Sequence, residues 1–453
     1  MPKIGGSRFV NRMKRLLVLL IVLLLLLLLM ILGEDSWGVS PFFLWTVLIA
    51  LFFAVKALMG KVSRTEEESE EFQPEKEEFL EERAHALAEK LEPFISVRGW
   101  RTVDEMVQFE GLLQMDPAEA LKGINDVVDS SKVRVTLTDS GKNRVQVTLV
   151  PKQDQQPVAK KPNCPLHGTL LLLTIATTTW AGAMHQGINL LQDPAKLTVG
   201  LPYSIGLLLI LAAHEFGHYF AARRHNIQVS PPYFIPVPFA LGTFGAFIKI
   251  RGSVENRRAL FDVAAAGPLA GLLLAIPALL VGLPLSKVII GNAAPGLSES
   301  GVEVGSSFLM AFLSKLTLGA AIAEGHRLIL HPLAFAGWLG LLLTTLNLLP
   351  IGQLDGGQIA HALFGYRRAY AISIVALGSL FLLAFFVWPG LAIWAFIAFF
   401  IAGAKDAPTA NDVTPLDSSR QALGYFAFTL LALILMPVPH SLYGTFGIHC
   451  PYL

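Results

Sequence analysis

The sequence predicts a polytopic α-helical membrane protein with about nine transmembrane helices, a small cytosolic α+β domain, and a β-hairpin or loop next to its candidate active site. Two observations support this fold class. The 453 residues are 53% hydrophobic and only 15% charged, and long apolar runs recur along the chain, which is typical of membrane proteins. One sizeable polar block, residues 62–163, interrupts these runs. The chain therefore contains membrane-spanning parts and one water-exposed domain.

The overall charge and the cysteine content exclude several kinds of site and partner. The formal net charge is +1, so the chain as a whole lacks the charge imbalance typical of proteins that bind nucleic acid. We expect no nucleic acid as a partner. Cys164 and Cys450 are the two cysteines, too few for a disulfide framework or a cysteine-based zinc site. Histidines and carboxylates must therefore bind any metal ion.

Residues 1–61 are predicted to form a pair of transmembrane helices. The apolar run from Leu16 to Leu32 is long for the hydrophobic part of a signal peptide, and no small-residue cleavage pattern follows it. We therefore interpret this run as a retained transmembrane helix. The positive-inside rule places the N-terminus in the cytosol, because basic residues precede the run: Arg8, Arg12, Lys14 and Arg15.

The candidate spans were identified on the basis of about 20 apolar residues for each crossing. Most lysine and arginine residues between them fall on one side of the resulting nine-span topology, as the positive-inside rule requires, and the C-terminus then lies outside. A shorter apolar segment, residues 306–323, contains Lys315 and is not counted; it could span, re-enter or lie in the interface. The candidate spans lie near 15–33, 41–60, 166–186, 203–223, 259–284, 330–350, 368–387, 389–404 and 421–438.

The polar block is predicted to be a cytosolic α+β domain with an acidic start and a polar linker back to the membrane. A helix is expected near residues 76–93. Apolar residues then alternate over 133–137 and over 145–149, around a turn at 139–141, which is the pattern of a β-hairpin. The predicted parts of the chain are the N-terminal helices 1–61, the cytosolic domain 62–163, the membrane core 164–365 and the C-terminal transmembrane helices 366–453.

Two histidines flank a glutamate in HEFGH, residues 214–218, at the end of an apolar run. Residues four apart share one face of an α-helix, so His214 and His218 can direct both imidazoles at one point, with Glu215 beside them. Zinc hydrolases use this arrangement: the histidines bind the metal, and the glutamate takes a proton from the attacking water. The alternative is a pair of polar residues that face the membrane interface. This alternative is disfavoured because the motif lies in a predicted span, where uncompensated His and Glu side chains are costly.

A catalytic zinc site needs a third protein ligand, and the best candidate lies far along the chain. In NLLPIGQLDGGQ, residues 347–358, a predicted span ends near Pro350, and Asp355 precedes two glycines. A buried cation would need such a carboxylate at the broken end of a membrane helix. The alternative is a plain helix-terminating turn, because Asp-Gly is a common turn dipeptide. The histidines interpreted as lying outside the site are His225, His326, His331 and His361.

Together the two stretches resemble the paired signatures of the site-2 protease family of intramembrane zinc metalloproteases. A third stretch, AAAGPLAGLLLA at 264–275, resembles the glycine-proline motif of that family's intervening helix, although Gly267 and Gly271 also suit simple helix packing. The polar block and GTFGAFIKIRG, residues 242–252, are most similar to the EGY-type branch. The resemblance is strongest over residues 165–365. It implies one catalytic zinc ion, bound by His214, His218 and Asp355, with Glu215 as the general base.

Two further features have competing interpretations. Residues 231–252 carry four prolines and then an alternating apolar stretch, which predicts a loop followed by extended chain. A free strand edge there could pair with a substrate in extended form; the alternative is a loop packed on the core. Asn347 could donate to a substrate carbonyl or a developing oxyanion, or it could hydrogen bond between helices.

The expected function is an intramembrane zinc metalloendopeptidase that hydrolyses peptide bonds in or near transmembrane segments of other membrane proteins, as in regulated intramembrane proteolysis. The resemblance implies an anti-sigma factor or another single-span protein as the substrate, within the lipid bilayer. The competing class is a non-enzymatic polytopic protein, a transporter or scaffold, with a structural metal site. Because the N-terminal stretch is not a serine-rich, acid-poor transit peptide, we expect a bacterial plasma membrane rather than a plastid membrane.

Overall fold

The structure is a computed structural model that describes most of the chain from residue 84 onwards. The predicted N-terminal transmembrane helices, the acidic start of the polar block, its linker and part of the predicted span at 389–404 lie outside the described residues. The described residues are 84–103, 106–128, 133–141, 144–151, 164–238, 241–250, 254–290, 307–319, 326–386, 395–396, 398–403, 406 and 408–436.

Residues 84–151, here called the sheet domain, contain a four-stranded antiparallel sheet in the order β1-β2-β4-β3. Residues 84–91 are helical, and helix α4 (Pro117–Val127) follows β2 in the chain. Apolar side chains from the helices and the strands form one buried core, which includes Leu91, Phe109, Ile124 and Leu137. The strands are β1 (Ile95–Val103), β2 (Met106–Leu113), β3 (Val133–Gly141) and β4 (Arg144–Pro151).

The predicted β-hairpin is present as β3 and β4. Leu137 pairs with Val147 and Val135 pairs with Leu149, and all four side chains are buried. The alternation that predicts these strands therefore also directs their side chains into the core. Strands β1 and β2 were not predicted. The register between them shifts just before Gly99, and such a bulge puts the following side chains out of phase with a simple alternation.

Four helices among the described residues are long and apolar enough to cross a membrane. They agree with the predicted α-helical membrane fold, whereas the predicted number of nine crossings is not confirmed. The uncounted segment 306–323 contains helix α8 (Phe308–Leu318). At 1.5 Å per residue this helix rises about 16 Å, roughly half of a ~30 Å hydrocarbon layer, so α8 alone is too short to span. The four long helices are Pro194–Arg224, Arg257–Gly282, Tyr366–Ala384 and Ser418–Leu435.

The predicted spans that fall on described residues coincide with helices, although several boundaries differ. Helix α9 has 17 residues, and the span predicted at 389–404 contains a short π-helical segment, Ala398–Ala402. A ten-residue helix, α10 (Asp355–Phe364), lies between α9 and α11. The matching helices are α5 (Cys164–Met184), α6 (Leu197–Arg224), α7 (Arg257–Gly282), α9 (Pro332–Leu348), α11 (Tyr366–Phe386) and α13 (Ser418–Leu435).

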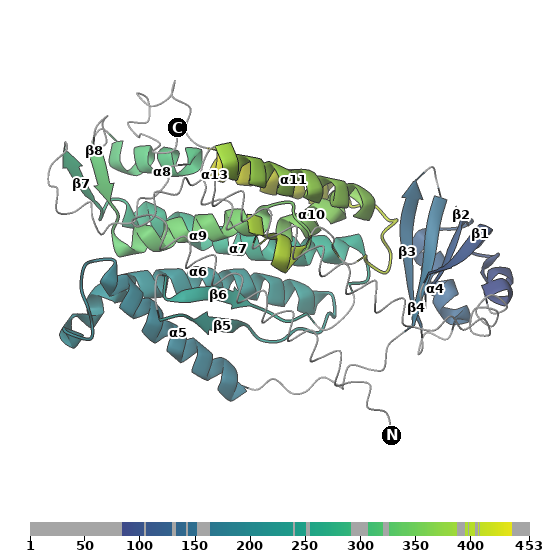
Figure 1. Cartoon of the computed structure of the whole chain (residues 1–453), viewed down its shortest axis with the longest axis horizontal. Helices are drawn as coiled ribbons and strands as arrows, with labels where there is room; N and C mark the ends of the chain where they lie inside the picture. The colour runs from purple at the N-terminus through teal and green to yellow at the C-terminus, as the bar shows by residue number, and fades with distance from the viewer. Residues whose placement is uncertain are drawn as a thin grey trace, which may run out of the picture. The chain divides into compact units, whose positions relative to one another are not determined.

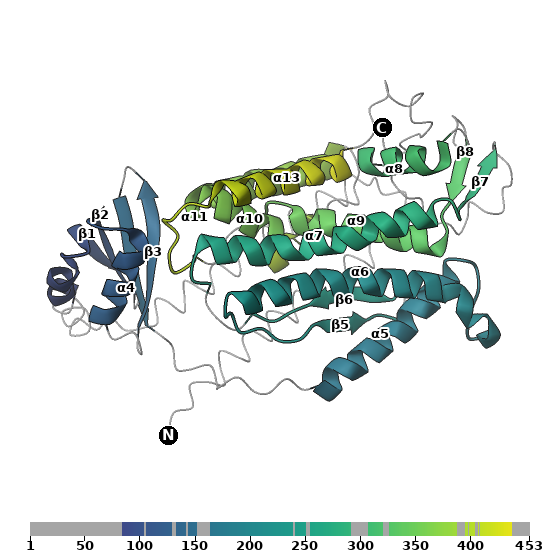
Figure 2. The same cartoon turned by 180° about the vertical axis from the view of Figure 1, so that it is seen from behind.

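Helices α6, α7 and α9 lie side by side (Figures 1 and 2). Small residues permit this close approach. A Cβ added at Gly217 of α6 would lie 2.5 Å from the carbonyl oxygen of Ala266 in α7, and one added at Gly282 of α7 would lie 2.4 Å from the backbone nitrogen of Ala334 in α9. Membrane helices commonly pack in this way, because small residues let their backbones come together.

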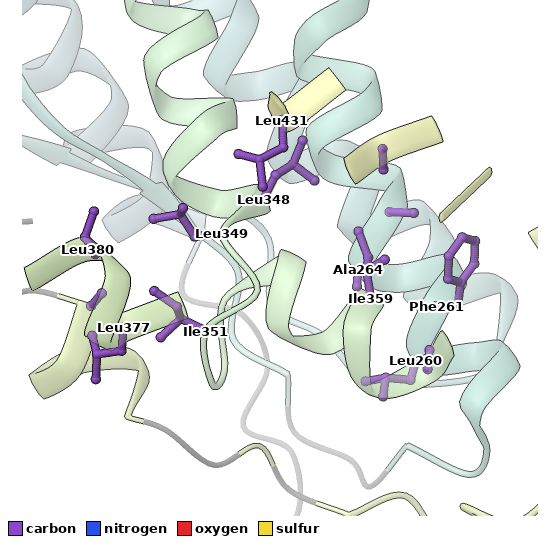
Figure 3. Close-up of a cluster of buried hydrophobic side chains, with 14 of the residues drawn as sticks. Leu260, Phe261, Ala264, Leu348, Leu349, Ile351, Ile359, Leu377, Leu380 and Leu431 are labelled. Atoms are coloured by element: carbon purple, nitrogen blue, oxygen red, sulfur yellow. The ribbon is translucent and has the colours of Figure 1, made fainter. Parts of the chain in front are cut away.

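A cluster of buried apolar side chains fixes the turn between α9 and α10 (Figure 3). Leu348 ends α9, Ile351 lies in the turn and Ile359 lies in α10. Gly352 in this turn has a φ of +47°, and its N–H donates to Ser373 Oγ at 3.0 Å. The turn is therefore held by packing on both sides. Its partners from α7, α11 and α13 include Leu260, Phe261, Leu377, Leu380 and Leu431.

Two pairs of short strands accompany the membrane helices. Strands β5 (Tyr233–Pro236) and β6 (Thr243–Phe247) pair antiparallel, in the segment where extended chain is predicted. The Tyr203 hydroxyl of α6 donates to the carbonyl of Leu241 at 2.8 Å, which anchors this hairpin to the helices. Strands β7 (Lys287–Ile290) and β8 (His326–Ile329) form a second pair, which was not predicted.

Candidate metal centre

Three of the predicted site residues lie in the C-terminal half of α6. His214, Glu215 and His218 are all buried. Because four residues make slightly more than one helical turn, both imidazoles leave the helix on the same face. Their Nε2 atoms lie 3.0 Å apart. The spacing in HEFGH therefore brings two nitrogen donors to one point.

Asp355 reaches the same point from the first residue of α10. Its Oδ2 lies 3.4 Å from His214 Nε2 and 3.3 Å from His218 Nε2. The glycine that follows is required by the close approach of two backbones, because a Cβ added at Gly356 would lie 1.9 Å from the carbonyl oxygen of Leu348. The Asp-Gly-Gly turn thus places a carboxylate against the two histidines.

The three donor atoms fit a zinc ion. In a tetrahedral zinc site with bonds of about 2.0–2.1 Å, neighbouring ligand atoms lie about 3.3–3.4 Å apart. The separations here are 3.0, 3.3 and 3.4 Å, close to one face of such a tetrahedron, and three protein ligands leave its fourth corner for water or substrate. Within the part of the chain that the structure describes, this is the one group of at least three His, Cys, Asp or Glu side chains placed to hold a metal ion.

His218 is held in the orientation that metal binding requires. Its Nδ1–H donates to the carbonyl oxygen of Val263 in α7 at 2.7 Å. Since a carbonyl only accepts, Nδ1 carries the proton and Nε2 presents its lone pair to the site. Gly267 of α7 leaves room for the ring, because a Cβ added there would lie 2.1 Å from His218 Nε2. The glycine-proline motif therefore provides space for a histidine as well as helix packing.

Glu215 and Asn347 lie beside the three donors. The Glu215 carboxylate lies near the backbone of Ile248, which follows β6 directly. Asn347, in the last turn of α9, places its Nδ2 3.2 Å from His214 Nε2. The site thus contains a carboxylate that can transfer a proton and an amide that can donate a hydrogen bond.

The other histidines lie away from this group. His225 Nε2 contacts Asp262 Oδ2 at 2.8 Å, and His331 caps the start of α9 by accepting from a backbone N–H. His361 is fully buried between two aspartates. The side chain of His326 lies outside the described part of the structure. The support that Val263 and Gly267 give to His218 was not predicted from the sequence. The run of small residues in AAAGPLAG is the feature of the sequence that could have indicated it.

Comparisons with known proteins agree with this geometry. Residues 202–387 match the model of Peptidase family M50, a range that contains every predicted site residue. The Probable zinc metalloprotease EGY2, chloroplastic, of Arabidopsis thaliana is 30% identical over 355 residues, which cover 75% of this chain and 61% of that protein. The protein of the same name from Oryza sativa subsp. indica is 31% identical, covering 74% and 62%. The Probable zinc metalloprotease EGY1, chloroplastic, of Arabidopsis thaliana is 36% identical, covering 55% and 45%.

The chain thus spans 61% of the length of the Arabidopsis EGY2 relative. These matches confirm the resemblance that the HEFGH and Asp-Gly-Gly motifs predict. Residues 202–387 are thus similar to Peptidase family M50, and the chain is similar to the EGY-type zinc metalloproteases.

Proposed function

We propose that the protein is an intramembrane zinc metalloendopeptidase that hydrolyses peptide bonds in or near transmembrane segments of other membrane proteins. One observation carries the proposal: the side chains of His214, His218 and Asp355 converge at distances that suit zinc, and two of them come from a helix long and apolar enough to cross a membrane. The M50 match and the names of the relatives support the same activity.

The chemistry follows from the positions of the side chains. A zinc ion bound by the three donors would polarise the scissile carbonyl and make a water molecule more acidic. Glu215 lies next to His214 on α6, where its carboxylate can accept the proton of the attacking water and deliver it to the leaving nitrogen. Asn347 can donate from Nδ2 to the substrate oxygen as negative charge develops there. The carbonyl of Val263 keeps His218 in one tautomer throughout.

The β5–β6 hairpin is proposed to hold the substrate in extended form. A helical peptide keeps its carbonyl groups in hydrogen bonds, so its backbone must be unwound before hydrolysis. The backbone that follows β6 lies near the Glu215 carboxylate, so a strand aligned with β6 would pass close to this carboxylate. A photoreactive group in place of Phe244, which is 72% exposed, is expected to crosslink to the substrate near its cleaved bond; crosslinks only to distant parts of the substrate would favour a hairpin that merely packs on the core.

We propose that the substrates are single-span membrane proteins, for example an anti-sigma factor, which are cleaved while they are embedded in the lipid bilayer. The test combines metal content and cleavage in full-length wild type and Glu215→Gln with a panel of such substrates. Both proteins are expected to hold about one zinc per chain, because Glu215 is not among the three donors. Cleavage by Glu215→Gln is expected to fall by about 10²–10⁴-fold.

The opposite results identify which part of the proposal fails. If Glu215→Gln cleaves as well as wild type, Glu215 is not the general base. If wild type holds zinc but cleaves none of a broad panel, the competing class is favoured, namely a transporter or scaffold with a structural metal site.

We also propose the nine-span topology with the N-terminus and the sheet domain on the same side of the membrane, which is the stroma in a plastid and the cytosol in a bacterium. The distribution of basic residues supports it, and so do α6 and α9, which both bring their C-terminal ends to the metal site, as this topology requires. A single cysteine introduced at Glu110 in the sheet domain is expected to resist a membrane-impermeant thiol reagent in sealed membranes that enclose the stromal or cytosolic side. Labelling of that cysteine without permeabilisation would place the domain outside.

The location within the cell is a separate proposal. The EGY relatives are named chloroplastic, which favours a plastid membrane over the bacterial plasma membrane that we expected from the sequence. We therefore propose a plastid membrane, with the bacterial plasma membrane as the competing location. Fractionation of the source cells, followed by detection of the protein in purified membranes, decides between them.

A further inference from the structure

A short segment connects the sheet domain to the membrane helices. Residues 408–414, here called the strap, run along the edge strand β3. The N–H of Leu137 in β3 donates to the carbonyl of Ala410, and the N–H of Asp412 donates to the carbonyl of Leu137, both at 2.8 Å. Leu137 and Asn411 thereby form a parallel β-bridge. The strap adds a strand-like segment to this edge of the sheet.

The strap is also bonded to the segment that leads into α7. The N–H of Asn411 donates to the carbonyl of Glu255 at 2.8 Å. The next residue, Asn256, caps α7 by accepting from a backbone N–H of its first turn at 2.9 Å. Helix α7 supplies the carbonyl that orients His218. One hydrogen-bonded layer thus runs from the sheet to a helix of the metal site.

Asp412 of the strap holds α10 through His361. The Nε2 of His361 donates to Asp412 Oδ1 at 2.6 Å, and its Nδ1 donates to Asp406 Oδ2 at 2.7 Å. Because both partners are carboxylates, which accept, both ring nitrogens donate and the imidazole is protonated. Burial lowers the pKa of His361, but the hydrogen bonds to the two aspartates outweigh it and raise the pKa to about 9. We call the contact of His361 with Asp412 the tie. Breaking it is costly, since removing one partner would leave a buried charge unpaired.

Further contacts join the strap to α11 and the end of α10 to α7. Asp412 Oδ2 accepts from the N–H of Tyr366 at the start of α11, at 3.1 Å. At the end of α10, the carbonyl of Ala362 accepts from Nε of Arg257, the first residue of α7, at 2.8 Å. Asp355 is the first residue of this ten-residue helix, so fewer than three turns separate the tie from the metal-site carboxylate.

We propose that His361 is a positioning residue that links the sheet domain, through the strap, to Asp355. This inference rests on the proposed zinc site. Loosening the strap from β3 weakens the hold on Asp355, and zinc bound by Asp355 in turn tightens the strap. Such coupling is reciprocal, because each event changes the free energy of the other by the same amount.

Hydrogen exchange of full-length wild type with and without zinc is the first test. The amides of Leu137 and Asp412 bond the strap to β3, and they are expected to exchange about tenfold more slowly when zinc is bound. The amides that pair β2 with β4 are the internal control, and their exchange is expected to stay the same. If zinc leaves the exchange of both the Leu137 and the Asp412 amides of wild type unchanged, the proposal is overturned. This comparison needs no variant.

Two variants test the tie itself. His361→Gln removes the charged contact with Asp412, and we expect zinc affinity, measured by competition with a chelator, to fall about tenfold, with a lower kcat and an unchanged KM. Arg367→Gln is the matched control, because Arg367 Nη1 donates to the carbonyl of Ser140 at 3.2 Å and so joins β3 to α11 without passing through the strap. It is expected to keep the zinc affinity of wild type. Asp412→Asn tests the tie from the strap side if His361→Gln does not fold.

The outcomes separate this inference from the proposed function. If wild type binds zinc and Glu215→Gln loses cleavage, but His361→Gln binds zinc as tightly as wild type, the coupling is wrong and the protease remains. An equal fall in affinity in Arg367→Gln also overturns the coupling, since general loosening of the sheet domain would explain both variants. Wild type that binds no zinc overturns both proposals.

Discussion

The metal site and the strap both join distant parts of the chain, but they consist of different kinds of contact. In the metal site, side chains meet: two imidazoles from α6 and one carboxylate from α10. Where the strap meets β3, backbone groups of Leu137, Ala410 and Asp412 pair, and almost any residue except proline can supply them. Side-chain chemistry leaves a motif in the sequence, whereas backbone pairing between distant segments leaves none.

The two regions should also differ in their response to substitution. Each side chain in the metal site supplies one of three donors, so no neighbour can replace it. The strap is held by several hydrogen bonds, so the loss of one is shared among the rest. We therefore expect the largest effects at the metal site, smaller ones at its supporting contacts, and the smallest on the exposed face of the sheet domain.

Asp355→Ala is expected to have the largest effect. It removes one of three donors, so zinc affinity should fall by more than about 100-fold, and cleavage should be lost with it. Chelator competition on the purified proteins measures the affinity. Asp193→Ala is the control, because Asp193 is an exposed aspartate paired with Lys196; a variant at Asp355 that binds zinc as tightly as this control would exclude Asp355 as a ligand.

Gly267→Ala tests the space that α7 leaves for His218. The added methyl group would meet the imidazole at 2.1 Å, so the ring must shift, and we expect zinc affinity to fall about 10–100-fold. Gly378→Ala in α11 is a matched control, since a Cβ there has no neighbour within 4 Å. Equal zinc affinity in the two variants would show that His218 does not need this space.

The protonated state of His361 predicts a pH dependence of stability. Its pKa in the folded protein, about 9, lies above the ordinary value of 6.5. Its contribution is therefore fully present below about pH 6.5 and is lost as the pH rises through about 9. Between about pH 7 and about pH 10, the unfolding temperature of zinc-free wild type should fall more than that of His361→Gln. Parallel curves for the two proteins would exclude a charged tie.

Arg144→Ala should have the smallest effect. Arg144 and Glu110 form an ion pair at 3.2 Å on the surface of the sheet, with both side chains about 40% exposed, and such pairs contribute about 0–1 kcal/mol. Chemical denaturation should show little change, and zinc affinity should match wild type. A fall in zinc affinity as large as that of His361→Gln would mean that the sheet domain reaches the site by a route other than the strap.

The membrane helices and the grouping of the site residues could be predicted because their signals are local. Apolar length predicts α6 and α7, and the four-residue spacing of His214 and His218 predicts the shared face. The alternation from Val133 to Leu149 predicts β3 and β4 for the same reason. The local sequence did not suffice to predict Asp355 as a ligand, because Asp-Gly is also a common turn. The resemblance to site-2 proteases linked its motif to HEFGH.

Other features could not be predicted because they depend on distant neighbours. The bulge near Gly99 hides the alternation of β1, and β7 and β8 are four-residue strands whose pairing is set by the fold around them. His361 was interpreted as lying outside the site, and it is indeed absent from the donor group. Its partners Asp406 and Asp412 lie more than 40 positions away, and no spacing rule connects them.

X-ray absorption at the zinc edge of full-length, zinc-loaded protein tests most directly whether His214, His218 and Asp355 hold the ion. We predict a spectrum with histidine scattering, nitrogen and oxygen neighbours at about 2.0–2.2 Å and no sulfur. The spectrum of Asp355→Ala, loaded at high zinc concentration, should differ by the loss of the carboxylate neighbour. A wild-type spectrum without histidine scattering, or identical spectra for wild type and Asp355→Ala, would contradict the assignment of the metal site.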